Sequence, residues 1–287
     1  MTVSLPAIAV LGAGSMGSSI VHGLLDGGAT VSGGIRVTNR TEAKAAMLRM
    51  PGVASLALET DPNANHSALE GAKLVLIAVK PFMVADLLDE IAPSLDSDAI
   101  VVSVAAGLTL DTLQAHLPAG VAAVRAVPNT PVGVRLGVTC VAASDTTTPE
   151  QLALVVDLFE AIGEAVVMPE DQVDAGTALA GSGPAYVFYF IEKLVDVARE
   201  AGFSGADAAT LVEGTFRGSI ELLSRSEHSA EELRRRVTSP GGTTAEAIRV
   251  FDEAKLGEVF ADAIQANMAR SQQMAADAAA KAADNAS

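Results

Sequence analysis

Short apolar runs rich in β-branched residues alternate with segments of helical periodicity through the first half of the chain. Gly, Pro, Asn or Asp bounds each run, as is typical of strands. Strands that alternate with helical segments form a parallel sheet with crossover helices on its faces. The pattern therefore predicts an α/β fold with a doubly wound parallel sheet. The predicted strands are 7–12, 35–39, 74–79, 99–104, 122–127 and 137–143, with an edge strand at 165–169.

The β-branched runs stop after Pro169, and helical periodicity continues from there. We therefore predict two domains: one built on the sheet at residues 1–168, and an all-helical one at residues 169–287. The alanine-rich tail from Ala275 predicts a fraying helix end with no chemistry of its own,.

One predicted helix, at 185–203, has an unusually apolar surface. It is apolar on nearly all sides from Tyr186 to Ile191, and it is expected to stop at Gly202,. Such a helix must be covered on every face, either by neighbours in its own domain or by a partner subunit. The small size of the second domain favours the partner.

Composition narrows the range of ligands. The 287 residues include 19 Lys and Arg against 35 Asp and Glu, for a formal net charge of −16. Such a charge disfavours general binding to nucleic acid or anionic membranes, so local groups must hold any anionic ligand. The single cysteine, Cys140, permits neither an intramolecular disulfide nor a cysteine-rich metal site, and no metal is expected,. This cysteine usage fits a reducing cytoplasm. Because the N-terminus lacks a basic region and no apolar run reaches about 18 residues, we expect a soluble, unprocessed protein,.

The first predicted strand is followed by a glycine-rich turn and a helical pattern. Its glycines form G-x-G-x-x-G in this strand–turn–helix context,. The first glycine permits the tight turn, the second lets a pyrophosphate approach the backbone, and the third lets helix and strand pack closely. The pattern predicts a Rossmann-type dinucleotide-binding domain. The residues expected to contact the cofactor are Gly12, Ala13, Gly14, Ser15, Met16 and Gly17.

The end of the second strand indicates which dinucleotide binds. NAD-binding folds usually carry Asp or Glu there, for the ribose 2′-hydroxyl. This chain has Asn39, Arg40 and Thr41 instead. A guanidinium binds a 2′-phosphate through charge-assisted hydrogen bonds, and amide or hydroxyl neighbours add to them. The sequence therefore predicts NADPH as the preferred cofactor and NADH as a second one; the alternative is that Arg40 is merely an exposed strand-end charge.

The strand at 74–79 leads into AVKPF at the carboxyl edge of the sheet, where ligands of such folds bind,. Ala78, Val79 and Pro81 are expected to line the ribose and nicotinamide end of the dinucleotide. Lys80 is a cofactor contact, a catalytic lysine or a solvent-facing loop residue, since a loop position alone does not separate these roles.

A second anion seat is predicted far along the chain, in the stretch SPGGTT at 239–244. Two adjacent glycines leave backbone amides uncovered, and the helix start that follows aims further unpaired N–H groups outward. The alternative is a local role, because Thr243 and Glu246 fit the T-x-x-E capping box that begins a helix,. Helix capping alone does not require two glycines after a proline, so the sequence favours the ligand-binding role over the capping role.

Together with the glycine-rich loop and AVKPF, three further motifs resemble the pyrroline-5-carboxylate reductase family. They are RAVPNTP at 125–131, DAGTALAGSGPAY at 174–186 and VTSPGGTT at 237–244, and the resemblance runs in order from residue 7 to residue 274. It implies an N-terminal dinucleotide-binding domain followed by a helical dimerisation domain. It also implies reduction of the cyclic imine 1-pyrroline-5-carboxylate to L-proline with NADPH or NADH.

The resemblance assigns roles to single residues. Asn65 is expected to contact the adenosine ribose of the cofactor. The substrate carboxylate is expected to occupy the second anion seat, held by the Ser239 hydroxyl and the amides of Gly241 and Gly242, with Thr243 in the same turn. The implied assembly is a homodimer, or a decamer built from dimers.

Hydride addition to a C=N carbon needs the nitrogen protonated or hydrogen-bonded, but it needs no strong general base. Thr244 lies one residue into the predicted helix and can donate its hydroxyl to the ring nitrogen, so it is our candidate catalytic residue. Two other routes stay open: the iminium arrives already protonated, or it receives its proton from water. The histidines lie outside every motif expected to touch the substrate; they are His22, His66, His116 and His228.

Two other functions are compatible with the cofactor fingerprint. An NADP-dependent hydroxyacid dehydrogenase needs a lysine or histidine base in the helix after the linker, where the first lysine is Lys193, about three turns beyond Gly181,. A catalytically silent NADP-binding sensor instead predicts cofactor binding without turnover.

Overall fold

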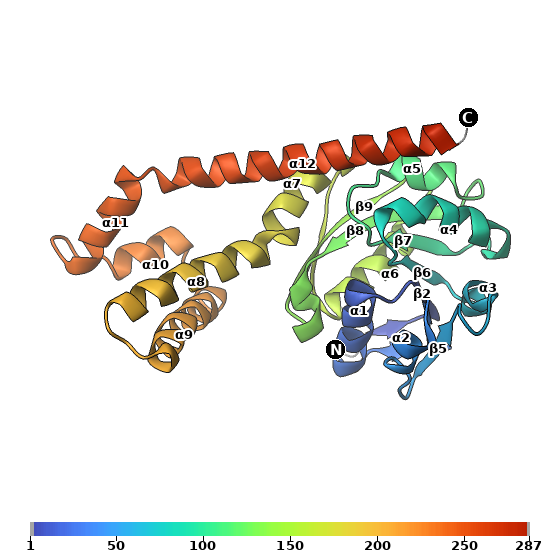
Figure 1. Cartoon of the computed structure of the whole chain (residues 1–287), viewed down its shortest axis with the longest axis horizontal. Helices are drawn as coiled ribbons and strands as arrows, with labels where there is room; N and C mark the ends of the chain where they lie inside the picture. Colours follow the sequence, from blue (N-terminus) through green and yellow to red (C-terminus); the bar gives the residue numbers. More distant parts are fainter. Residues whose placement is uncertain (1–2, 286–287) are drawn as a thin grey trace. The chain divides into compact units, whose positions relative to one another are not determined.

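The computed structural model describes residues 3–285 (Figure 1). Its main feature is an eight-stranded sheet in the order β10-β9-β8-β7-β6-β2-β4-β5, and β1 and β3 pair separately. All the predicted strands are present, including the edge strand. Their bounds are β1 Ser4–Leu5, β2 Ile8–Leu11, β3 Thr30–Val31, β4 Ile35–Asn39, β5 Val53–Ala57, β6 Leu74–Ile77, β7 Ile100–Ser103, β8 Ala122–Pro128, β9 Gly137–Ala143 and β10 Gly163–Val167.

The sheet differs from the prediction in two respects. Strand β5 was not predicted, because VASLA has few β-branched residues and no strict alternation,. Strand β9 runs antiparallel to β8, whereas the other neighbouring pairs of this sheet are parallel. The reason is the connection: only the short 3₁₀ segment η3 (Thr130–Val134) joins β8 to β9, and a parallel pair needs a much longer crossover,.

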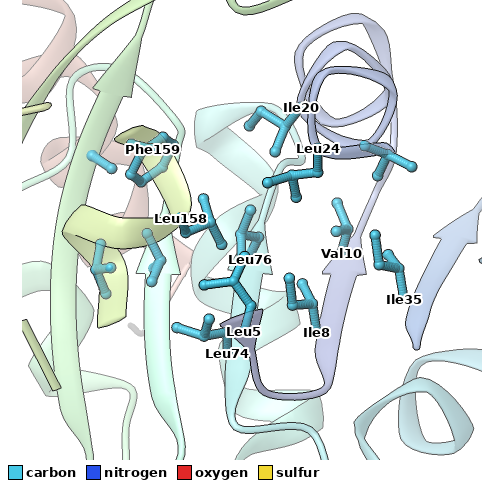
Figure 2. Packing of buried hydrophobic residues seen from close by; sticks show 14 of the residues in the cluster. Leu5, Ile8, Val10, Ile20, Leu24, Ile35, Leu74, Leu76, Leu158 and Phe159 are labelled. Carbon is cyan, nitrogen blue, oxygen red and sulfur yellow. The ribbon is translucent and has the colours of Figure 1, made fainter. Parts of the chain in front are cut away.

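Helices cover both faces of the sheet, and successive strand residues face opposite sides. Ile8 and Val10 of β2 pack in one apolar cluster with α1 and α6, as Figure 2 shows, whereas Ala9 and Leu11 join the opposite cluster with α4 and α5,. Each fully buried Leu, Ile or Val side chain contributes roughly 1.5–3 kcal/mol. The helices of the sheet region are α1 Ser15–Asp26, α2 Glu42–Ala46, α3 Ala64–Leu69, α4 Val84–Ile91, α5 Leu110–Ala115, α6 Pro149–Glu160 and α7 Val173–Gly176.

By packing, the chain divides into two compact units: Met1–Ser182 with Asn267–Ser287, and Gly183–Ala266. The predicted boundary at 168/169 marks the end of the last strand, but α7 and the π-helix η5 (Thr177–Gly181) still pack on the sheet unit. The second unit is helical, as predicted. The remaining helices are α8 Gly183–Glu200, α9 Gly205–Ser224, α10 Ala230–Arg236, α11 Thr243–Glu253 and α12 Leu256–Asn285, the last of which returns to the first unit.

The apolar helix predicted near residue 185 is α8, and Gly202 follows it with a φ of 95°. The rest of its unit leaves large apolar side chains of it exposed: Phe188, Tyr189 and Val197 are 63%, 57% and 58% exposed. The sequence left two possibilities for covering this helix: neighbours in its own domain or a partner subunit. These exposures favour the partner subunit. No helix within residues 3–285 is long and apolar enough to cross a membrane.

Candidate functional site

The glycine-rich turn between β2 and α1 is folded tightly against the loop after β6. Gly12 has a φ of 78°, and a Cβ atom there would lie 2.3 Å from Cγ1 of Val79. At Gly17, a Cβ atom would lie 3.1 Å from Cβ of Ala78. The first and third glycines therefore perform the packing roles predicted from the sequence.

The start of α1 leaves a seat for an anion. Gly14 is the N-cap and has no side chain, and its virtual Cβ meets nothing closer than 3.9 Å. Within residues 3–285, the amides of Ser15, Met16 and Gly17 donate no hydrogen bond. Free amides at a helix N-terminus bind phosphate well, so this backbone fits the pyrophosphate of a dinucleotide.

The residues predicted to select NADPH lie together at the end of β4. Asn39 is only 3% exposed, and its Nδ2 is a buried donor that has no partner among the described residues. Arg40 is exposed, and Thr41 is the N-cap of α2 without a side-chain capping bond. An unpaired donor beside an exposed guanidinium fits a phosphate ligand.

A carboxylate that the sequence reasoning missed lies next to this group. Glu59 accepts a hydrogen bond from the Glu42 amide at 2.9 Å, and its own amide donates to the Arg40 carbonyl at 3.1 Å. It therefore occupies the N-terminus of α2, close to the predicted 2′-phosphate. Glu59 follows strand β5, which was not predicted. The sequence pattern therefore gave no reason to place Glu59 at this edge of the sheet.

The other residues predicted to contact the cofactor differ in their solvent exposure and hydrogen bonding. Asn65 is 3% exposed, and its Nδ2 donates to Glu90 Oε1 at 3.0 Å. Ala78 and Val79 line the glycine-rich turn, as described above, and Pro81 begins a 3₁₀ turn. Lys80 is exposed and has no ion pair in the described part of the chain, which leaves its role a prediction.

The predicted substrate seat is a tight turn followed by α11. Gly242 N donates to the Ser239 carbonyl at 3.0 Å, with Pro240 second and Gly241 third in the turn at a φ of 71°. This is the arrangement of a type II turn, which requires glycine at the third position. A Cβ atom at Gly242 would lie 2.5 Å from the Ser239 hydroxyl oxygen, so a side chain there would displace that hydroxyl.

This turn corrects two expectations. The Gly242 amide, assigned to the substrate carboxylate, is already used to close the turn. The capping-box alternative is also wrong: Gly242 is the N-cap, no side-chain capping bond forms, and Glu246 pairs with Arg249 at 3.0 Å. Over the described residues, the amides of Gly241, Thr243 and Thr244 donate no hydrogen bond and are free for an anion,.

Two motifs quoted without a role prove to be bonded to each other. Arg125 is 4% exposed, and its Nη2 donates to Asp174 Oδ1 at 2.7 Å. Glu170 lies 3.7 Å from Nη1 and accepts from the Leu110 amide. Asn129 donates to the carbonyl of Ala180 at 3.0 Å. No local signal in the sequence indicates these pairings, because the partners lie 49 and 51 residues apart.

The side chains that could serve as a base in a dehydrogenase reaction lie outside the two anion seats. A hydrogen bond to Glu192 raises the pKa of Lys193, so its amine stays protonated and is a poor base,. His66 contacts Ser94 and His116 contacts Asp89, both outside the seats described above.

Comparison with known proteins covers both units. The family model "Pyrroline-5-carboxylate reductase dimerisation" matches residues 170–274, and "NADP oxidoreductase coenzyme F420-dependent" matches residues 7–107. The chain is 36% identical to pyrroline-5-carboxylate reductase of Mycobacterium leprae, over 96% of this chain and 98% of that protein. The Escherichia coli enzyme is 36% identical, over 93% and 97%. The chain belongs to the pyrroline-5-carboxylate reductase family.

Solved structures agree with the family assignment. A pyrroline-5-carboxylate reductase of Coxiella burnetii superposes with a TM-score of 0.83 at 33% identity, covering 93% of this chain and 97% of that one. A pyrroline carboxylate reductase of Plasmodium falciparum, solved with NADP bound, has a TM-score of 0.80 at 25% identity, with coverages of 94% and 98%. The reductase family thus accounts for both the sheet unit and the helical unit.

Proposed function

We propose that this chain reduces 1-pyrroline-5-carboxylate to L-proline with NADPH, the last step of proline biosynthesis. The observation that supports it best is a pair of anion seats made of free helix-start amides. One follows the glycine-rich turn, beside Asn39 and Arg40, and the other follows the Ser239–Gly242 turn. A dinucleotide and a small carboxylate are the two anions that a reductase of this family handles together.

Each group of the chain then has a separate task. The free amides of α1 hold the pyrophosphate, while Asn39 and Arg40 bind the 2′-phosphate. The free amides at the start of α11 and the Ser239 hydroxyl hold the substrate carboxylate. When bound, the cofactor supplies the hydride. Thr244 donates its hydroxyl to the ring nitrogen, which accepts the electron pair of the C=N bond; the proton itself comes from Thr244, from water or with the substrate.

An assay of the purified protein with 1-pyrroline-5-carboxylate and NADPH tests this function. We expect oxidation of NADPH that depends on the imine and yields proline. Binding of NADPH without turnover would instead indicate the sensor function. Oxidation of a hydroxyacid with NADP would indicate the dehydrogenase, although the protonated Lys193 argues against that chemistry.

The Arg40→Ala variant tests cofactor selection. We expect a loss of about 1.5–3 kcal/mol in NADPH binding free energy and little change for NADH, because only NADPH carries the phosphate that the guanidinium binds. Isothermal titration with each cofactor measures both. Arg49→Ala is the matched control, since Arg49 pairs with Glu42 nearby and should affect neither cofactor. Equal losses for NADPH and NADH would contradict this role of Arg40.

The dimerisation family model and the exposed apolar side chains of α8 support a homo-oligomer. We propose a homodimer as its unit; a decamer built from dimers and the cytoplasmic location are predictions. Light scattering of the purified protein distinguishes the dimer from the decamer.

A further inference from the structure

Asn129 lies at the edge of the sheet that carries the proposed cofactor seat. It directly follows β8, and β8 is parallel to β7, β6 and β2, so the loops after these four strands share one edge. Asn129 is 7% exposed, and both ends of its carboxamide are bonded: Oδ1 accepts from Val138 N at 2.9 Å, and Nδ2 donates to Ala180 O at 3.0 Å. One orientation of the amide satisfies both partners, because Val138 offers a donor and Ala180 an acceptor.

The Ala180 carbonyl, which accepts the hydrogen bond from Asn129, lacks the donor that an α-helix would normally provide. Ala180 lies in the π-helix η5, where the Ser182 amide donates five residues back to Thr177 at 2.9 Å. In an α-helix, the donor to the Ala180 carbonyl would be the residue four positions on. That residue is Pro184, which has no N–H,. The Asn129 side chain supplies a hydrogen bond where proline cannot.

The two ends of this π-helix line a cavity of about 240 Å³ in the same unit. Thr177 and Ser182 line it together with Ala106 and Gly107, which come from the loop after β7 at the edge named above. The Ser182 hydroxyl accepts a hydrogen bond from Asn267 at 2.9 Å. A π-turn beside a functional edge often marks a functional position.

We infer that Asn129 is a positioning residue for the reduction. It holds η5 in place, so that Thr177 and Ser182 keep their positions in the lining of this cavity, at the sheet edge that carries the proposed cofactor seat. The inference rests on the proposed function, because that function brings the hydride-donating end of the cofactor to this edge. Asn129 acts through the π-helix and is not expected to touch cofactor or substrate.

Asn129→Asp tests the inference, because Asp keeps the acceptor for Val138 and replaces the donor to Ala180 with a second oxygen. We expect kcat/KM for the imine to fall about tenfold while the Kd for NADPH is unchanged, since loss of the donor to the partly buried Ala180 carbonyl disturbs the lining of the cavity and leaves the α1 seat intact,. Adding Pro184→Ala to Asn129→Asp provides an N–H for the Ala180 carbonyl and should recover part of the lost kcat/KM.

Two controls separate this role from general destabilisation. Pro184→Ala alone should keep wild-type kinetics, because Asn129 already satisfies the carbonyl. Gln114→Glu makes the same amide-to-carboxylate change on α5, where the Gln114 side chain has no hydrogen bond within the described residues, and it should also behave as wild type. All variants are assayed as dimers, well below their measured melting temperatures.

The outcomes are distinct. Wild-type kcat/KM in Asn129→Asp, a parallel loss of NADPH affinity, or no recovery in the double variant would each overturn the positioning role. If the wild-type protein itself does not reduce the imine, the proposed function fails instead. Hydrogen exchange of the Ser182 amide then still tests the bond, with faster exchange in Asn129→Asp expected and an unchanged rate contradicting it.

Discussion

Two inactive variants should restore activity to each other when their chains are mixed. We predict that each active site combines the α1 seat of one subunit with the Ser239–Thr244 turn of its partner, since α8 exposes large apolar side chains and the family model is one of dimerisation. Gly14→Leu blocks the pyrophosphate seat, and nothing in the fold opposes a side chain there. Ser239→Ala with Thr244→Val disables the other seat.

The expected recovery follows from counting sites. Random remixing of equal amounts makes about half the dimers mixed, and each mixed dimer has one intact site, so about a quarter of the wild-type activity should return. If each site belonged to one chain, no mixture could recover activity. Mixtures that stay inactive, although mass spectrometry of differently tagged chains shows mixed dimers, would contradict the shared site.

A chain that carries all three substitutions provides the matched control. Mixed with an equal amount of wild type, it spoils both sites of every mixed dimer under the shared arrangement, which leaves about a quarter of the activity. Under the single-chain arrangement, every wild-type chain keeps its site, and about half the activity remains. The shared arrangement therefore predicts about a quarter of the wild-type activity in both mixing experiments, whereas the single-chain arrangement predicts none in the first and about half in the second.

Thr244→Val should slow the chemical step. Valine keeps the shape of threonine and removes the hydroxyl that is proposed to donate to the imine nitrogen. We expect kcat/KM for the imine to fall roughly ten- to a hundredfold, the scale of one hydrogen bond to a reacting group, with NADPH binding unchanged. Steady-state kinetics with the imine measures the first quantity and fluorescence titration of NADPH the second.

The neighbouring residue offers a control for this variant. Thr243→Val removes a similar exposed hydroxyl from the first position of α11 and keeps the free amides that are proposed to hold the carboxylate. It should cost less than Thr244→Val. Unchanged kinetics in Thr244→Val would show that the proton and the orientation of the imine come from another source.

Local patterns predicted most of the fold. The apolar runs identified every strand of the main sheet except β5, and the glycine spacing predicted the turn before α1, because both depend on residues close in sequence. The direction of β9 was missed because it depends on the length of the loop after Asn129, which strand patterns do not report.

The candidate site was predicted less completely, for a related reason. Helix starts at Ser15 and Thr243 follow from nearby glycines, so both anion seats could be expected from the sequence. The use of the Gly242 amide within its own turn depends on backbone geometry, which the sequence alone does not specify. The bond from Asn129 to Ala180 joins residues 51 positions apart and became apparent only in the structure.

Transfer of deuterium from the cofactor to the product tests the central claim most directly. The wild-type protein is incubated with 1-pyrroline-5-carboxylate and NADPH that carries deuterium at its hydride-donating carbon, and the product is analysed by mass spectrometry and NMR. We predict L-proline with deuterium on the former imine carbon, in proportion to the NADPH oxidised. Oxidised cofactor without labelled proline, or bound cofactor that is never oxidised, would contradict the reductase function.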